Sequence, residues 1–127
     1  MSWIVKYTER VTNMNLKSLY ICVQDMNRAI EFYEELLDQT VTEKDDIYSV
    51  FDINGFRLGL FAYERKGESH EYGSNCLPSL SVDSKAILEK KIMGKEICFP
   101  LTLIRGNWVV EIVDSEGNHI EMTAPAV

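Results

Sequence analysis

A histidine and a glutamate lie two positions apart near the end of the chain, within the sequence DSEGNHIEM at residues 114–122. The first part of this sequence is typical of a turn, and the alternation after it is typical of a strand. That alternation places His119 and Glu121 on the same face. Glu121 could ligate a metal, bind a ligand or lie in water, while His119 could act as a general base or be a polar surface residue.

An arginine in the first half of the chain is the predicted partner of Glu121. The sequence GFRLGLFA at residues 55–62 can be overlaid on GNHIEMTA at residues 117–124. The overlay matches Arg57 to His119 and therefore places Arg57 on the face that carries Glu121. A carboxylate in a partly buried place needs a partner. We therefore expect either an Arg57–Glu121 ion pair or a cationic ligand beside Glu121.

The signals for strands and helices follow the same order in the two halves of the chain. Asp25 is a typical N-cap for the first helix, and Asn54-Gly55 is a strong signal for a hairpin. Pro100 indicates a broken strand or an edge strand. The predicted elements are a strand at 16–24, a helix to about 37, strands at 47–53 and 56–63, a loop at 64–75, a strand at 77–82, a helix to about 94 that Asp83 or Ser84 caps, and strands at 96–104, 107–113 and 118–124. The chain is therefore predicted to be α+β, with two βαβββ modules.

The composition is that of a globular protein with an acidic surface. The chain has 127 residues, of which 46% are hydrophobic and 26% are charged, and its net charge is −7. This acidity argues against a nucleic-acid partner. Three widely spaced cysteines without a CxxC pair indicate reduced thiols. The sequence has no apolar run long enough for a membrane helix and no signal-peptide pattern, so we expect a cytoplasmic protein with no membrane partner.

Two segments resemble motifs of the vicinal oxygen chelate superfamily, which includes glyoxalase I, bleomycin-resistance proteins and extradiol dioxygenases. They are VQDMNRAIEFYEELL at 23–37 and VDSEGNHIEM at 113–122, where Ser115 replaces the family's usual proline. The resemblance implies two half-barrel sheets around a cavity, helices on the outer face, and a homodimer. It predicts one domain at 1–127, with a first module at about 16–63, a linker at 64–75 and a second module at about 76–124.

The resemblance also implies where a metal would bind. Metal-dependent members hold one divalent ion with His or Glu at four places, which fall here on Ser18, Gly59, Leu77 and Glu121. Only Glu121 is a good ligand among these residues. We therefore expect no cofactor and no metal at these places. The alternative is a divalent ion whose other ligands lie elsewhere in the chain or come from a dimer partner.

One face of the predicted sheets carries many small residues, which cannot fill the hollow of a curved sheet. We expect a ligand cavity on this face, and the alternative is a solvated face. The predicted ligand-binding residues are Glu121, Arg57, Tyr20, Phe61, His119, Trp108, Ser18, Gly59 and Leu77, with Glu121 and His119 as catalytic candidates. The leading function is metal-independent binding of a small organic molecule, as in bleomycin-resistance-like proteins. The alternatives are a glyoxalase-type lyase, isomerase or dioxygenase, and a sensor or interaction module with a vestigial pocket.

Overall fold

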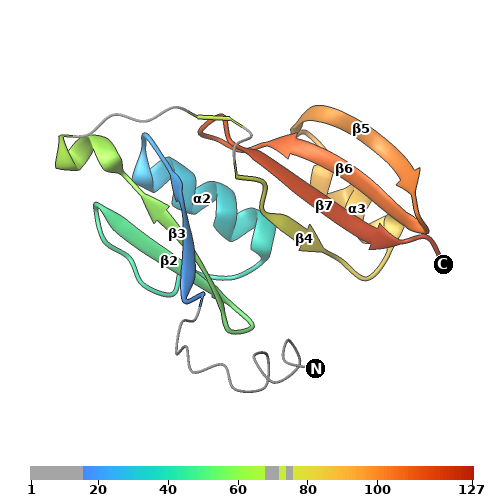
Figure 1. Ribbon diagram of the computed structural model, residues 1–127, viewed down its shortest axis with the longest axis horizontal. Coiled ribbons are helices and arrows are strands. Elements are labelled where there is room, and N and C mark those ends of the chain that lie inside the picture. The colour runs from blue at the N-terminus through green and yellow to red at the C-terminus, as the bar shows by residue number, and fades with distance from the viewer. Residues whose placement is uncertain (1–15, 68–71, 74–75) are drawn as a thin grey trace, which may run out of the picture.

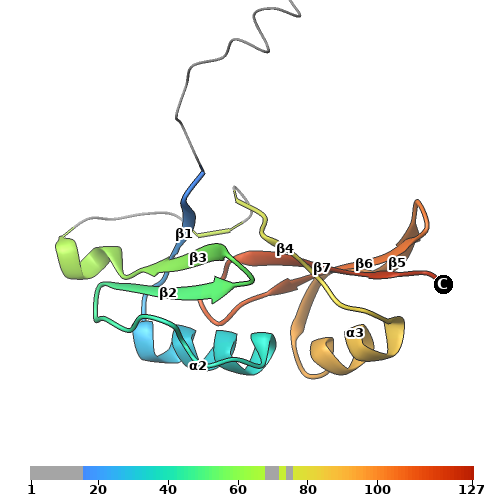
Figure 2. The same ribbon diagram turned by 90° about the horizontal axis from the view of Figure 1, so that it is seen from below.

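The computed structural model describes residues 16–67, 72–73 and 76–127. Two sheets lie side by side in one layer, and the two α-helices form a second layer against one face of them (Figure 1, Figure 2). Neither α-helix covers the opposite face of the sheets, which we call the open face. No helix in the described part of the chain is long and apolar enough to span a membrane.

The first sheet has the strand order β1–β3–β2, with β1 parallel and β2 antiparallel to β3. Its strands are Ser18–Cys22 (β1), Tyr48–Ile53 (β2) and Phe56–Phe61 (β3), and a 3-10 helix, η1, follows at Tyr63–Lys66. The predicted hairpin turns at Asn54 and Gly55, whose φ angles are 52° and 92°. Positive φ at both central residues is what a two-residue hairpin turn requires.

Helix α2, at Met26–Leu37, begins at its predicted N-cap. The Asp25 carboxylate accepts a hydrogen bond from the backbone N–H of Arg28 at 3.1 Å, which satisfies one of the free N–H groups of the first turn. The buried residues of the helix recur every three or four positions: Met26, Ala29, Ile30, Tyr33 and Leu36. This spacing produces one apolar face, which packs beneath the first sheet.

The second sheet has the strand order β4–β7–β6–β5, with β4 parallel to β7 and the other pairs antiparallel. Its strands are Ser79–Ser81 (β4), Glu96–Ile104 (β5), Asn107–Val113 (β6) and His119–Pro125 (β7). Helix α3, at Lys85–Ile92, is capped by Ser84 rather than Asp83. Strand β5 carries Pro100 and lies at the edge of the sheet, as predicted from that proline.

The first module has one strand fewer than the predicted βαβββ order. The segment before β2 pairs with it only at a single bridge, between Glu43 and Val50. The chain then turns, because the Asp45 carboxylate accepts hydrogen bonds from the backbone N–H groups of Ile47 and Tyr48. Such side-chain to backbone bonds compete with a strand ladder. The α+β class is confirmed, and the two sheets do not form a closed barrel.

The core lies between the sheets and the helices and follows the predicted alternation of β1, β3, β6 and β7. Its completely or almost completely buried strand residues are Ile21, Phe51, Leu58, Leu60, Val110, Ile112, Ile120, Met122 and Ala124. Since successive residues of a strand point to opposite faces, the residues between these positions lie on the open face. The positions of the buried apolar residues therefore determine which side chains lie on the open face and are available for binding.

Candidate functional site

The open face of the first sheet carries a cluster of three aromatic rings. The Tyr48 and Phe61 rings stack with their centroids 4.8 Å apart, and Tyr20 meets Tyr48 edge-on at 5.9 Å. A Cβ atom on Gly59 would come within 2.3 Å of the Tyr20 ring, so this ring lies directly over the glycine. The small residue is thus covered by a neighbouring aromatic and leaves no hollow. Because Tyr20 and Tyr48 are each 43% exposed, a single chain forms a partly solvated face here and not the enclosed cavity that we expected.

The open face of the second sheet carries two carboxylates on neighbouring strands. Glu121 of β7 lies directly opposite Glu111 of β6, and such opposite residues have their Cβ atoms about 4.5–5.5 Å apart. Glu121 accepts a hydrogen bond from the Ser79 hydroxyl at 2.6 Å. Within the described residues, neither glutamate forms an ion pair with a basic side chain. This face therefore concentrates negative charge and is suited to a cation.

The predicted Arg57–Glu121 ion pair is wrong. Arg57 lies on the open face of β3, as its alternation predicted, but its guanidinium binds the Glu43 carboxylate at 2.9 Å. Glu43 lies beyond β2, whereas β7 belongs to the other sheet and is separated from β3 by the edge strands β1 and β4 (Figure 1). The overlay of the two halves correctly assigned the face of Arg57, but it carried no information about the distance between the sheets.

The other predicted residues are spread over the molecule. Ser18 begins β1 and His119 begins β7, both half-buried. Leu77 precedes β4 and is 40% exposed. Trp108 lies opposite the buried Ala124, and the Lys85 ammonium of α3 lies 4.1 Å from its ring centroid. Trp108 therefore belongs to the helix side of the second sheet and does not share the open face with Glu121.

The four places that the family uses for a divalent ion do not form a metal site in this chain. Gly59 has no side chain, and the Tyr20 ring occupies the space above it. Ser18 is a poor ligand for a transition metal, and Leu77 supplies no donor atom. Glu121 alone is left, and one carboxylate does not hold such an ion.

A groove of about 370 Å³ lies between the first sheet and strand β4. Residues of both sheets line it, and most of them are apolar: Leu19, Ile53, Asn54, Phe56, Leu58, Pro78, Ser79, Leu80 and Ser81. Ser79 lines the groove and donates its hydroxyl to Glu121, so a carboxylate lies next to one wall. This groove could not be predicted from local sequence patterns, because it forms where two separately predicted modules meet.

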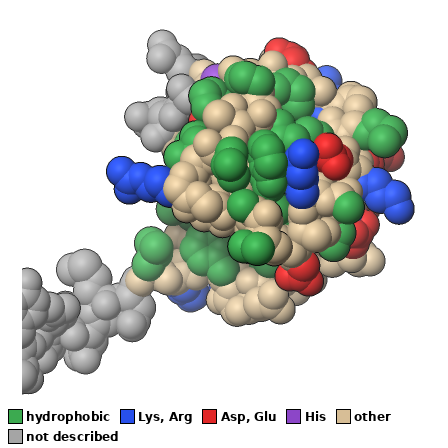
Figure 3. All heavy atoms as spheres, turned by 90° about the vertical axis from the view of Figure 1, so that its right-hand side faces the viewer, with side chains coloured by type: hydrophobic (Ala, Val, Ile, Leu, Met, Phe, Trp, Pro, Cys, Tyr) green, Lys and Arg blue, Asp and Glu red, His purple; other side chains and the backbone are tan. Residues whose placement is uncertain are grey.

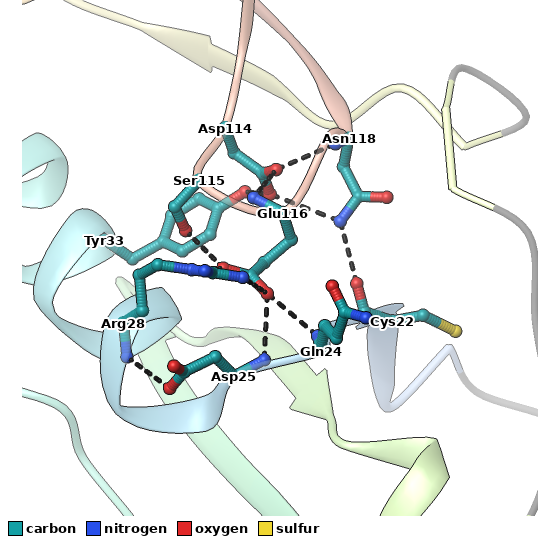
Figure 4. A network of polar contacts seen from close by, with 9 residues as sticks. All are labelled: Cys22, Gln24, Asp25, Arg28, Tyr33, Asp114, Ser115, Glu116 and Asn118. Atoms are coloured by element: carbon teal, nitrogen blue, oxygen red, sulfur yellow. Dashed lines mark hydrogen bonds and ion pairs between the residues drawn. The ribbon is translucent and has the colours of Figure 1, made fainter.

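A network of polar contacts centred on Glu116 joins the turn before β7 to the start of α2 (Figure 4). The completely buried Glu116 carboxylate accepts hydrogen bonds from the backbone N–H groups of Gln24 and Asp25, at 2.8 and 2.9 Å. It also forms a two-pronged pair with the Arg28 guanidinium, at 2.8 and 3.0 Å, and accepts the Ser115 hydroxyl. The negative charge at the N-terminus of α2 is favourable for the helix dipole.

The same turn is fixed from within by Asp114. This buried carboxylate accepts hydrogen bonds from the Tyr33 hydroxyl at 2.5 Å and from the N–H groups of Glu116 and Asn118 at 2.8 Å. The Asn118 amide in turn donates to the Cys22 carbonyl at 2.8 Å. This turn therefore holds the two modules together and sets the position of the strand that carries Glu121.

The charge of Glu116 is stabilised by its partners. Burial alone raises the pKa of this carboxyl, but the hydrogen bonds from Arg28, from the Asp25 and Gln24 N–H groups and from Ser115 outweigh it and lower the pKa to about 2. Arg28, the other half of the ion pair, has its pKa raised by the same contact. Glu116 is therefore a structural anion, and its contacts leave no free oxygen for a ligand.

The fold agrees with the comparison of the chain with known families. Residues 14–126 match the family model of the Glyoxalase/Bleomycin resistance protein/Dioxygenase superfamily. Since this match covers most of the chain, the protein belongs to that superfamily. No curated protein is significantly similar to the chain.

Solved structures of other proteins share the fold at low sequence identity. A glyoxalase/bleomycin resistance protein/dioxygenase from Nocardioides is 16% identical, with 98% of this chain and 91% of that chain covered and a TM-score of 0.70. A protein of unknown function from Agrobacterium tumefaciens is 22% identical, with 89% and 95% covered and a TM-score of 0.71. A lactoylglutathione lyase from the same species is 15% identical, with 91% and 96% covered and a TM-score of 0.70. At these identities the likeness establishes the fold alone.

Proposed function

We propose that the chain binds a small organic molecule in the groove between its two sheets, with Glu121 attracting a positively charged group of that molecule. The observation that carries the proposal is the combination of a mostly apolar groove of about 370 Å³ with a Ser79–Glu121 pair at its wall. Small-molecule sites typically have such volumes and such a composition, with a few polar groups that orient the ligand. In this proposal binding requires no metal at the family's four places.

The charge of the ligand follows from the carboxylates near the groove. Glu121 and Glu111 lie directly opposite each other, and like charges in this arrangement destabilise a sheet. A bound cation would relieve their repulsion, whereas an anion would add to it. The neighbouring Ser79 hydroxyl already fixes one oxygen of Glu121, which reduces the entropy lost when a ligand is bound.

Three ligands of the same shape test this proposal: benzylammonium, benzyl alcohol and benzoate. We expect benzylammonium to bind at least tenfold more tightly than benzoate, which corresponds to about 1.4 kcal/mol or more, with benzyl alcohol between them. Binding is measured by chemical-shift titration of the protein. Phe56→Ser is expected to weaken all three ligands equally, because Phe56 lines the groove without carrying charge.

Glu121→Gln is the matched control for charge. A glutamine side chain can still accept the hydrogen bond from Ser79, so the stability should change little, while the preference for benzylammonium over benzoate should disappear. Equal binding of the cation and the anion by the wild-type protein would contradict the role of Glu121. Failure of all three ligands to bind would contradict the groove as the binding site.

We also infer that the protein is a homodimer that pairs through the open face of its first sheet. The support is the exposed aromatic cluster of the first sheet, since exposed apolar patches commonly mark interfaces. Figure 3 shows a second surface with hydrophobic side chains, at the end of the molecule formed by the second module. Strand β5 of that module exposes Ile97, Leu103 and Ile104. Pro100 and the register shifts of β5 disfavour pairing along that edge.

Sedimentation velocity distinguishes the two surfaces. We expect the mass obtained for the wild-type protein to be twice that of one chain. Tyr48→Lys places a charge within the aromatic cluster, so we expect the mass of this variant to be that of a single chain. The matched control is Leu103→Lys on β5, which should leave the dimer intact. A monomeric wild-type protein, or dissociation by Leu103→Lys instead of Tyr48→Lys, would contradict the inference.

A further inference from the structure

Three residues with metal-ligating side chains lie together on the second sheet, away from the four places that the family uses. Cys98, Glu111 and His119 each direct one donor atom into the same region, and the three atoms lie within 4.8 Å of one another. They come from three consecutive strands, β5, β6 and β7. Cys98 is exposed, and the other two are half-buried, so the cluster is accessible from solvent.

The sheet register explains why these side chains meet. His119 and Glu121 lie on the same face of β7, and Glu111 lies opposite Glu121, so His119 and Glu111 are diagonal neighbours on that face. On β5 the pairing shifts between Ile97 and Phe99, which leaves Cys98 as the extra residue of a bulge. A bulge interrupts the strict alternation of a strand and redirects a side chain. The irregularity therefore allows Cys98 to share the face of Glu111.

The donor set has the chemistry of a transition-metal site. Thiolate, imidazole and carboxylate are the three ligand types of zinc, with bonds of about 2.3, 2.0–2.1 and 2.0–2.2 Å, and these lengths place donor atoms about 3.3–3.6 Å apart in a tetrahedral site. The donor atoms here are within 4.8 Å before any ion is bound. Shifts of about 1 Å in the donor atoms would bring them to the separations of a tetrahedral zinc site.

The local charge also favours a cation. Glu111 faces Glu121 directly across the two strands, and within the described residues no lysine or arginine forms an ion pair with either of them. A divalent cation bound by Glu111 would neutralise this pair and remove a repulsion that the sheet otherwise retains. The position of Glu121 beside the cluster makes it the nearest carboxylate for a fourth ligand.

We propose that Cys98, Glu111 and His119 form a zinc site on the open face of the second sheet, with a fourth position for Glu121 or water. Its three ligands lie outside the four places that the family uses, and only the fourth position includes one of those places, Glu121.

Cobalt provides a direct test, because Co²⁺ in a zinc site reports its ligands through its absorption spectrum. Chelator-treated full-length protein is titrated with Co²⁺. We expect one equivalent to produce the visible bands of a four-coordinate ion and a thiolate-to-cobalt charge-transfer band, both removed by one equivalent of Zn²⁺. Cys98→Ser is expected to abolish the charge-transfer band. Glu111→Gln and His119→Ala are each expected to weaken binding at least tenfold.

Cys22→Ser is the matched control, since it removes a thiol from the first sheet and leaves the cluster on the second sheet unchanged. It should retain the complete cobalt spectrum. Far-ultraviolet circular dichroism of each variant establishes that the fold is intact, and a competition titration with Zn²⁺ measures affinity independently of the spectrum. A wild-type protein without a charge-transfer band would overturn the proposal. A band that persists in Cys98→Ser, or binding that is unchanged in both Glu111→Gln and His119→Ala, would overturn it as well.

Discussion

Glu116→Gln is expected to lower the free energy of unfolding by about 3 kcal/mol, because it removes the charge from a buried and completely hydrogen-bonded site. The carboxylate accepts bonds from Gln24, Asp25, Arg28 and Ser115. A glutamine has only one acceptor oxygen, and its NH₂ group would face donors. At least one backbone N–H at the start of α2 would then lose its partner. Urea denaturation at neutral pH measures the effect.

Arg28→Gln is the matched control on the other side of the same ion pair. The Arg28 side chain is 50% exposed, whereas that of Glu116 is completely buried. Water can therefore solvate a Glu116 oxygen after Arg28 is removed, and the two backbone donors remain. We expect a loss of about 1 kcal/mol. If both substitutions cost the same, the ion pair rather than the backbone contacts would account for the stability.

The pH dependence of stability provides a second measurement of the Glu116 effect. The pKa of Glu116 is about 2 in the folded protein, compared with 4.5 for an unperturbed glutamate. The contribution of the ionised Glu116 to the free energy of unfolding is therefore complete above the pKa of glutamate in the unfolded chain. This contribution is lost as the pH falls from about 5 towards 2. This lowering of the Glu116 pKa corresponds to about 3 kcal/mol in the free energy of unfolding. Solvent around the half-exposed Arg28 screens the ion pair and reduces this value towards about 2 kcal/mol. The difference between wild-type protein and Glu116→Gln should shrink in this window and stay constant above it.

The elements that were predicted correctly depend on local chemistry. Asp25 caps α2 through a contact three residues away, and the turn at Asn54 and Gly55 depends on the φ angles of those two residues. The buried faces of the strands follow from alternation, which a sheet enforces along its whole length. For the same reason the open-face positions of Tyr20, Glu121 and His119 could be read from the sequence. No comparable local rule determines which residues contact these three side chains.

The features that were missed depend on contacts between distant parts of the chain. Glu116 binds the start of α2, which is 91 residues away from it at Asp25, and nothing in the DSEGN turn identifies that partner. The position of Arg57 was correct, but Glu43 binds it because the segment before β2 folds back beside the sheet. The opposition of Glu111 and Glu121 was accessible in principle, since counting outward from the predicted turn pairs them. The bulge that brings Cys98 close to these two residues could not be predicted from the sequence.

The turn at residues 114–118 links these structural contacts to the binding face. Asp114 and Asn118 close the turn through a backbone hydrogen bond from the Asp114 N–H to the Asn118 carbonyl at 2.8 Å. Strand β7 begins at the next residue, His119. Because a shift by one residue would exchange the two faces of a strand, the contacts of this turn determine whether Glu121 faces Glu111 or the core. Variants of the turn should therefore affect stability and the open face together.

Asp114→Ala is expected to destabilise the fold by about 3 kcal/mol or more, because it leaves buried donors of Tyr33, Glu116 and Asn118 without their acceptor. Burial and the Asp114 charge raise the pKa of Tyr33, so the phenol stays protonated and needs that acceptor. The matched control is Asp52→Ala at the equivalent turn of the first module. Asp52 is exposed and its carboxylate accepts one bond, from the Gly55 N–H at 2.8 Å, so we expect a loss of about 1 kcal/mol. Thermal and urea unfolding of the two variants measure the difference, and equal losses would mean that the buried network at Asp114 contributes no more than an ordinary surface turn.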